Sequence, residues 1–166
     1  AFWKNYLYGV DKPTGLSIKQ AKPGKGSAAY HAAYGRQIAG EWFDFVAKNK
    51  LTFASLIYSA WGILLQNYND TDDVLFGITV SGRDSTIRGI EHIVGLFIRT
   101  VPMRVQGYAK ETSSELVKRV NENLKSSKEY ETFPLVQIKE YSQIDNKTDM
   151  FDTLLVIENY PLDKKL

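Results

Sequence analysis

Residues 53–80, with the sequence FASLIYSAWGILLQNYNDTDDVLFGITV, carry a helix and a strand in direct succession. Apolar side chains recur at the helical period of about 3.6 residues over 53–68, and Thr52 in front of them is a suitable N-cap. Residues 74–80 are apolar and rich in β-branched side chains, which is typical of a buried strand. A helix and a strand this close together predict elements of both kinds around one core, in an α/β or α+β fold.

On the N-terminal side of this stretch, two more helices are expected. Apolar residues recur at helical spacing over 37–49. Residues 2–8 fit one short helix with its apolar side chains on one side, namely Phe2, Trp3, Tyr6 and Leu7. The prolines and glycines of 11–27 predict a loop, and the small and aromatic residues of 28–34 predict a strand.

On the C-terminal side, two further strands are expected. Residues 93–105 form a long, mostly apolar and β-branched run. Pro102 within this run has no N–H to donate, so it should lie on an edge strand, at a bulge or near the end of the strand. The continuous apolar run at 153–157 predicts a strand that is buried on both faces, and Asn159 with the two residues after it ends that run.

Two helix starts are also visible in this half of the chain. Thr112 and Glu115 have the spacing of a capping box, which predicts a helix over about 113–128. Pro134 suits the first turn of a helix that continues to Tyr141, because its missing N–H needs no partner there.

The composition limits the class of protein. The chain has 166 residues, which suits one domain, and 43% of them are hydrophobic, which is enough for a sizeable core. The net charge of +2 is close to balance, so a nucleic-acid partner is not expected. No apolar run approaches the roughly 20 residues that span a bilayer, so no membrane partner is expected and the cytoplasm is the expected location. The absence of cysteine excludes disulfides and thiol chemistry.

A search for catalytic or metal-binding patterns assigns no chemistry. The only histidines are His31 and His92, and neither has a second ligand at metal-binding spacing, so no metal is expected. The chain has no G-x-S-x-G motif, and the glycines of 77–82 lack the lysine of a phosphate-binding loop. Residue types and spacing alone therefore indicate a mixed domain without a catalytic set.

Several longer blocks, taken in order along the chain, carry more information. They are FWKNYL at 2–7, TDDVLFGITVSGR at 71–83, GIEHIVGLFIRTVPMR at 89–104, YETFPLVQIKEY at 130–141 and FDTLLVIENYP at 151–161. Together they resemble the condensation domains of nonribosomal peptide synthetases, and the resemblance spans almost the whole chain. Each block alone is also compatible with an ordinary core strand or helix.

This resemblance implies a fold like that of chloramphenicol acetyltransferase, with two similar lobes and a tunnel between them. It also implies two partners, a donor and an acceptor peptidyl carrier domain, which insert phosphopantetheine arms that carry thioesters. The acceptor amine would attack the donor thioester and form an amide. No cofactor bound covalently to this chain is expected.

The resemblance also shows what this chain lacks. The family's HHxxxDG motif lies in the N-terminal lobe, and no pair of adjacent histidines occurs here. Residues 1–166 therefore resemble the C-terminal lobe, beginning inside a longer chain and stopping before the family's last strand and helix. Its partner would be the N-terminal lobe of the same domain, and no catalytic residue is expected in this part.

Three residues are candidates for a structural or tunnel role by this resemblance. Arg83 corresponds to the arginine of the SGR block and could bind the aspartate of the missing motif, or it could be a solvated loop residue. Asn159 corresponds to the asparagine of ENYP and could face the tunnel, or it could only form the turn before Pro161. Arg99 departs from the family pattern, which has asparagine there, and could alter the tunnel or the acceptor side.

The function of the parent domain is open between related activities. The ENYP block favours peptide-bond formation over epimerisation. Two alternatives remain at this point: a non-catalytic lobe that binds a carrier protein or another partner, and a lobe of a related acyltransferase. The presence or absence of HHxxxDG upstream would separate the enzyme from the binding protein.

Overall fold

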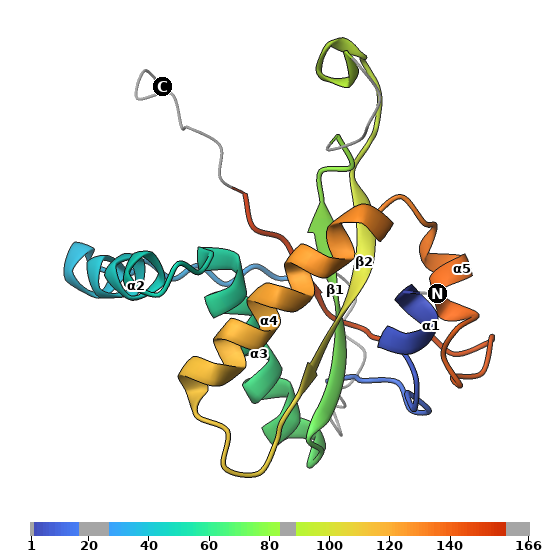
Figure 1. Ribbon diagram of the computed structural model, residues 1–166, viewed down its shortest axis with the longest axis horizontal. Helices are drawn as coiled ribbons and strands as arrows, with labels where there is room; N and C mark the ends of the chain where they lie inside the picture. Colours follow the sequence, from blue (N-terminus) through green and yellow to red (C-terminus); the bar gives the residue numbers. More distant parts are fainter. Residues whose placement is uncertain (1, 17–26, 84–88, 159–166) are drawn as a thin grey trace.

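The computed structural model describes residues 2–16, 27–83 and 89–158. Strands in these ranges form one sheet with the order β2-β1-β3 (Figure 1). Its members are β1 (Asp73–Val80), β2 (Arg99–Gln106) and β3 (Leu154–Leu155). β1 and β2 are antiparallel and paired along their full length, whereas β3 is parallel to β1 over two residues.

Helices cover both faces of this sheet (Figure 1). The longer ones are α2 (Arg36–Lys48), α3 (Phe53–Asn69) and α4 (Ser113–Ser127), and the shorter ones are α1 (Phe2–Tyr6), α5 (Leu135–Lys139) and the 3-10 turns η1 (Ile90–His92) and η2 (Lys128–Tyr130). α3 contacts β1, β2 and α4, and α5 contacts β2. α2 contacts α3 and extends away from the sheet.

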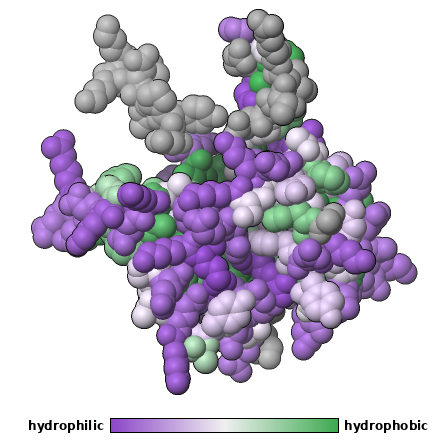
Figure 2. Space-filling model, in the orientation of Figure 1, coloured by the Kyte–Doolittle hydropathy of each residue, from purple (hydrophilic) through white to green (hydrophobic). Residues whose placement is uncertain are grey.

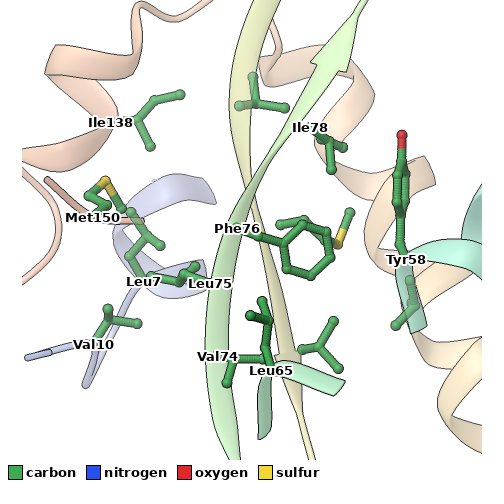
Figure 3. Close-up of a cluster of buried hydrophobic side chains, with 14 of the residues drawn as sticks. Leu7, Val10, Tyr58, Leu65, Val74, Leu75, Phe76, Ile78, Ile138 and Met150 are labelled. Carbon is green, nitrogen blue, oxygen red and sulfur yellow. The ribbon is translucent and has the colours of Figure 1, made fainter. Parts of the chain in front are cut away.

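β1 is buried on both faces because successive side chains of a strand point to opposite sides. Phe76 points toward α3, where its ring centroid lies 6.1 Å from that of Tyr58 (Figure 3). Leu75 points to the other face, toward Leu7 of α1 and Ile138 of α5. The central strand thus joins two apolar layers into one core.

The N-terminal segment is bonded to residues far along the chain. The indole Nε1–H of Trp3 donates to the carbonyl of Tyr130 at 3.1 Å. The amide of Thr14 donates to the carbonyl of Met150 at 3.1 Å, and the Thr14 hydroxyl accepts the amide of Leu75 at 2.9 Å. α1 and the loop after it are therefore fixed between β1 and the C-terminal third of the chain.

Arg104 of β2 links α1 to the sheet from a nearly buried position, with 8% of its surface exposed. Its Nε and Nη2 bind both carboxylate oxygens of Asp73, and its Nη1 donates to the carbonyls of Tyr6 and Tyr8 at 2.7 and 2.9 Å. The Arg104 amide donates to the hydroxyl of Tyr6 at 2.8 Å. Burial raises the pKa of Tyr6 to about 12, so this hydroxyl keeps its proton.

Most of the expected elements are confirmed, as is the mixed α/β class. Thr52 caps α3 by accepting the amide of Ser55 at 3.1 Å. Thr112 and Glu115 form the capping box of α4, with bonds of 2.8 and 3.3 Å. Pro102 lies on β2, which is an edge strand of the described sheet, so its missing N–H breaks no ladder bond.

Three strand predictions were wrong in part or in full. Residues 28–34 are exposed coil without a neighbouring strand among the described residues. Residues 93–98 are not strand, because the ladder ends where Val80 pairs with Arg99. The strand expected over 153–157 has only two paired residues and is half exposed, since one side of it has no neighbour within the described sheet. Part of the loop expected over 11–27 lies outside the described residues.

Helices in the described part of the chain are too short or too polar to cross a membrane.

Candidate functional site

One end of the sheet gathers the positions that the sequence singled out. β1 ends at Val80 and continues into Arg83, while β2 starts at Arg99, which pairs with Val80. Because β3 is parallel to β1, the chain after it leaves toward the same end (Figure 1). The hydroxyl of Thr79 donates to the carbonyl of Leu155 at 3.4 Å and confirms this alignment.

Arg83 is exposed, but its side chain turns back onto its own loop. Its Nη1 donates to the carbonyls of Ile90 and Ile93 at 3.0 and 3.1 Å, and its Nη2 to that of Gly95 at 3.4 Å. The guanidinium carbon lies 4.6 Å from the ring centroid of Phe97, a cation–π distance. One side chain therefore holds the segment 89–97 at several points.

The two residues before Arg83 shape the base of this loop. Gly82 has φ of +62°, and a Cβ there would collide with the carbonyl oxygen of Phe97. Only glycine combines this backbone conformation with such a close approach. The hydroxyl of Ser81 accepts the amide of Arg83 at 3.4 Å. The Ser81-Gly82-Arg83 block is thus a loop-closing turn.

The loop also exposes apolar side chains. Val94 is 99% exposed and Leu96 is 94% exposed. The loop projects beyond the sheet (Figure 1), and the face drawn in Figure 2 is mostly hydrophilic, with hydrophobic residues in separate areas. The segment between η1 and β2 is therefore fixed by the Arg83 side chain and exposes apolar side chains to solvent.

Arg99 binds a different part of the backbone. Its Nη1 donates to the carbonyl of Thr132, just after η2, at 2.7 Å. Next to this carbonyl, burial raises the pKa of the Glu131 carboxyl. Burial and, to a smaller extent, the Glu131 charge raise the pKa of Tyr58. Arg99 therefore ties the start of β2 to a segment that holds a half-buried carboxyl.

The remaining candidates contribute less. Asn159 lies outside the described residues, so its role stays a prediction. His31 lies in exposed coil and His92 ends η1, and within the described ranges no group of three or more His, Cys, Asp or Glu residues could hold a metal ion. Two surface pockets of about 440 and 370 Å³ occur beside α5 and beside the loop after α1, and neither is lined by Arg83 or Arg99.

Sequence reasoning missed Phe97, which the structure places under the Arg83 guanidinium. An aromatic residue inside an apolar run gives no sign that it will stack on an arginine. The acceptors of Arg83 are backbone carbonyls, which every residue has, so only the loop conformation identifies them.

Comparison with known proteins gives consistent results. A family model described as the condensation domain matches residues 1–166. The chain is 40% identical over 163 residues to tyrocidine synthase 2 of Brevibacillus parabrevis, an alignment that covers 97% of this chain and 4% of that protein. It is 36% identical over 168 residues to gramicidin S synthase 2 of Brevibacillus brevis, covering 99% of this chain and 4% of that protein. The chain thus spans only a small part of these relatives.

Solved structures share the fold. The X-domain from teicoplanin biosynthesis matches with a TM-score of 0.70 at 23% identity, over 92% of this chain and 35% of that one. A four-domain nonribosomal peptide synthetase bound to AMP and glycine matches with a TM-score of 0.70 at 19% identity, over 84% of this chain and 11% of that one.

Proposed function

The chain belongs to the condensation domain family, and on that premise we propose that it is the C-terminal lobe of a domain that joins two carrier-bound thioesters through an amide bond. The observation that carries the proposal is the family match over the whole chain, residues 1–166. The position of the family's motif residues at one end of the sheet supports it, because that end could form one wall of a shared tunnel.

In the proposed reaction, the amine nitrogen of the acceptor attacks the carbonyl carbon of the donor thioester. A C–N bond forms and the C–S bond breaks, the nitrogen loses a proton, and the thiol of the donor's phosphopantetheine leaves with one. Both pantetheine arms belong to carrier domains and arrive with the substrates. Holding the two thioesters in one tunnel raises their effective concentration, which supplies much of the acceleration.

The histidine that would assist the amine must come from outside this chain. His31 and His92 are its only histidines and are far apart in sequence. In the proposed domain the HHxxxDG motif of an N-terminal lobe supplies this group, which orients or deprotonates the amine or stabilises its developing charge. This lobe supplies the facing wall, and Arg83 is its candidate for binding the aspartate of that motif.

The test measures condensation with donor and acceptor carriers that have been loaded with aminoacyl thioesters. Dipeptidyl thioester is followed by mass spectrometry with this chain alone, with the N-terminal lobe alone and with the intact parent domain. We expect product from the parent domain only. Product above the protein-free background with this chain alone would disprove the proposal that the catalytic histidine comes from the N-terminal lobe. An inactive parent domain with correctly loaded carriers would disprove the proposed reaction.

A second function is favoured by one observation. The fold matches the X-domain from teicoplanin biosynthesis, which has also been solved in a complex with OxyB, at a TM-score of 0.69. A lobe of this fold could therefore bind a partner protein without catalysing a reaction. A parent sequence without the HHxxxDG motif would favour this binding role over condensation.

A further inference from the structure

Arg99 uses only one nitrogen of its guanidinium group at the end of the sheet. It is the first residue of β2, and it pairs with Val80, the last residue of β1. Its side chain is exposed, and its Nη1 donates to the carbonyl of Thr132 at 2.7 Å. Among the described residues, no acceptor lies on its Nε or its Nη2. A guanidinium that is bound through one nitrogen therefore presents its other N–H donors to solvent.

The described part of the chain also supplies no carboxylate that neutralises Arg99. Two other arginines, in β2 and in α4, do form ion pairs with carboxylates. Glu131 precedes Thr132 in the sequence, but its carboxyl is influenced differently: burial raises its pKa, and the opposing effect comes from the charge of Lys128. Within the described ranges, Arg99 thus carries a positive charge without an ion-pair partner.

This charge lies at the end of the sheet that the proposed function assigns to the tunnel wall. Arg83 adds a second guanidinium at the same end, and its bonds among the described residues all go to backbone carbonyls. In the proposed domain Arg83 has a candidate partner in the N-terminal lobe, whereas Arg99 has none. Opposite charges attract more strongly where water is excluded, as it is between two lobes. A tunnel lined by Arg99 would therefore attract an anionic group.

We propose that Arg99 is a specificity-determining residue that binds a carboxylate in the side chain of a carrier-bound substrate. The proposal rests on the proposed function, because only there does this end of the sheet line a tunnel. A carboxylate accepts two N–H bonds from one guanidinium, and the free donors of Arg99 suit such a pair. Aspartyl and glutamyl substrates would thus react faster than asparaginyl and glutaminyl substrates of the same shape.

The phosphate of a pantetheine arm is the other anion that enters the proposed domain. Every carrier-bound substrate has this phosphate, whatever its amino acid. The family pattern that the chain resembles has asparagine where Arg99 stands, so an arginine here suits a feature that differs between substrates. The side chain of the amino acid is such a feature, and we therefore assign the carboxylate to the side chain.

The test compares substrates that differ in charge and hardly in shape. Carriers are loaded with aspartate or asparagine, and separately with glutamate or glutamine, and are mixed with the intact parent domain and a carrier that holds a neutral amino acid. Initial rates of dipeptidyl thioester formation are measured by mass spectrometry with the charged or amide residue as the acceptor, and then as the donor. The readout is the ratio of the rate for the acid to the rate for its amide, which a general loss of structure does not change.

In the wild-type domain we expect a ratio of about ten in one of the two positions, the effect of one charge-assisted hydrogen bond in a partly solvated site. Arg99→Asn should bring this ratio close to one, and Arg99→Glu should bring it below one, because like charges repel. Salt of about 1 M reduces the Debye length to about 3 Å, so it should lower the ratio in the wild type and leave it constant in Arg99→Asn. Arg36→Asn, at an exposed arginine of α2, is the matched control and should keep the wild-type ratio.

Each other outcome has a separate meaning. Equal ratios in the wild type and in Arg99→Asn, in both positions, would overturn the proposal. A fall by the same factor for the acids and their amides would also overturn it, because that result indicates the phosphate or the loss of the bond to Thr132. If the parent domain forms no dipeptide from any correctly loaded pair, the proposed function is refuted and the specificity proposal with it.

Discussion

Removing the Arg104 side chain should destabilise the fold far more than neutralising its partner Asp73. Arg104 is 8% exposed and makes bonds to two kinds of acceptor: the Asp73 carboxylate and the carbonyls of Tyr6 and Tyr8. Arg104→Ala removes both sets of bonds. Asp73→Asn keeps an oxygen for the arginine and leaves the carbonyl bonds in place.

The size of each effect follows from exposure. Breaking a buried ion pair by removing one partner costs about 3–5 kcal/mol. The Asp73 side chain is 36% exposed, so water can solvate the carboxylate that remains, and the ion-pair contribution falls to about 1–2 kcal/mol. The two carbonyls of Tyr6 and Tyr8 lose a charged donor, which adds about 1 kcal/mol each. We therefore expect a loss of about 3 kcal/mol for Arg104→Ala and about 1 kcal/mol for Asp73→Asn.

Urea unfolding, followed by circular dichroism at fixed pH and salt, measures both losses. The double variant should cost little more than Arg104→Ala alone, because the asparagine then has no arginine to lose. Lys118→Ala, at an exposed position of α4, is the control for removing a positive charge. Equal costs for the two single variants would show that the carbonyl bonds contribute nothing, and a fully additive double variant would show that the pair is not coupled.

Further predictions concern helix packing, capping and pH. Gly62→Ala places a Cβ 2.6 Å from a methyl carbon of Val105, so overpacking of about 1–3 kcal/mol should outweigh the helix-propensity gain of about 1 kcal/mol. The Val105 Cβ also lies 2.7 Å from the added Cβ, so Val105→Ala should reduce the cost of Gly62→Ala in urea without abolishing it, and an equal cost in both backgrounds would refute the contribution of the Val105 methyls. Thr112→Ala should cost about 1 kcal/mol through loss of the α4 capping box, whereas Ser126→Ala on the same helix should cost nothing; equal losses would contradict a capping role. The pKa of Tyr6 is about 12 in the folded protein, and its ordinary value is 10.0. The contribution of Tyr6 to the free energy of unfolding is therefore complete below pH 10 and is lost as the pH rises to 12. Thermal melts over that range should show a fall of up to about 2 kcal/mol that is smaller in Tyr6→Phe, and equal falls in both proteins would exclude Tyr6 as the cause.

Helices were predictable from the sequence because apolar residues at helical spacing indicate a buried face, whichever element packs against that face. Strands were less predictable, since a strand exists only where a second strand offers partners. Residues 93–98 have the apolar, β-branched composition of a strand. The pairing between β1 and β2 nevertheless ends just before Gly82, where a positive φ turns the chain away from the sheet. Residues 93–98 therefore have no part of β1 opposite them with which to pair. Composition cannot show where such a ladder stops.

Of the candidate site, the sequence predicted that Arg83 follows a strand, and it did not predict the contacts of Arg83 or Arg99. The SGR block placed Arg83 after a strand, whereas Arg99 was expected inside a strand over 93–105, and only the structure shows that β2 starts there, opposite the end of β1. Their observed acceptors are carbonyls of residues 7 to 33 positions away, and carbonyls leave no mark in a sequence. The role of Asn159 stays a prediction from the resemblance.

The bonding of the N-terminal segment to the C-terminal third has a consequence during synthesis on the ribosome. Leu16 donates its amide to the carboxylate of Asp152, 136 residues later. At translation speeds of about 5–20 residues per second, that partner emerges on the order of ten seconds after Leu16. The apolar side chains of Trp3 and Leu7 therefore stay exposed to solvent for most of that time, while the local pairing of β1 with β2 can already form. A pause in translation shortly before Asp152 would lengthen this exposure and should increase aggregation or chaperone binding of the nascent chain.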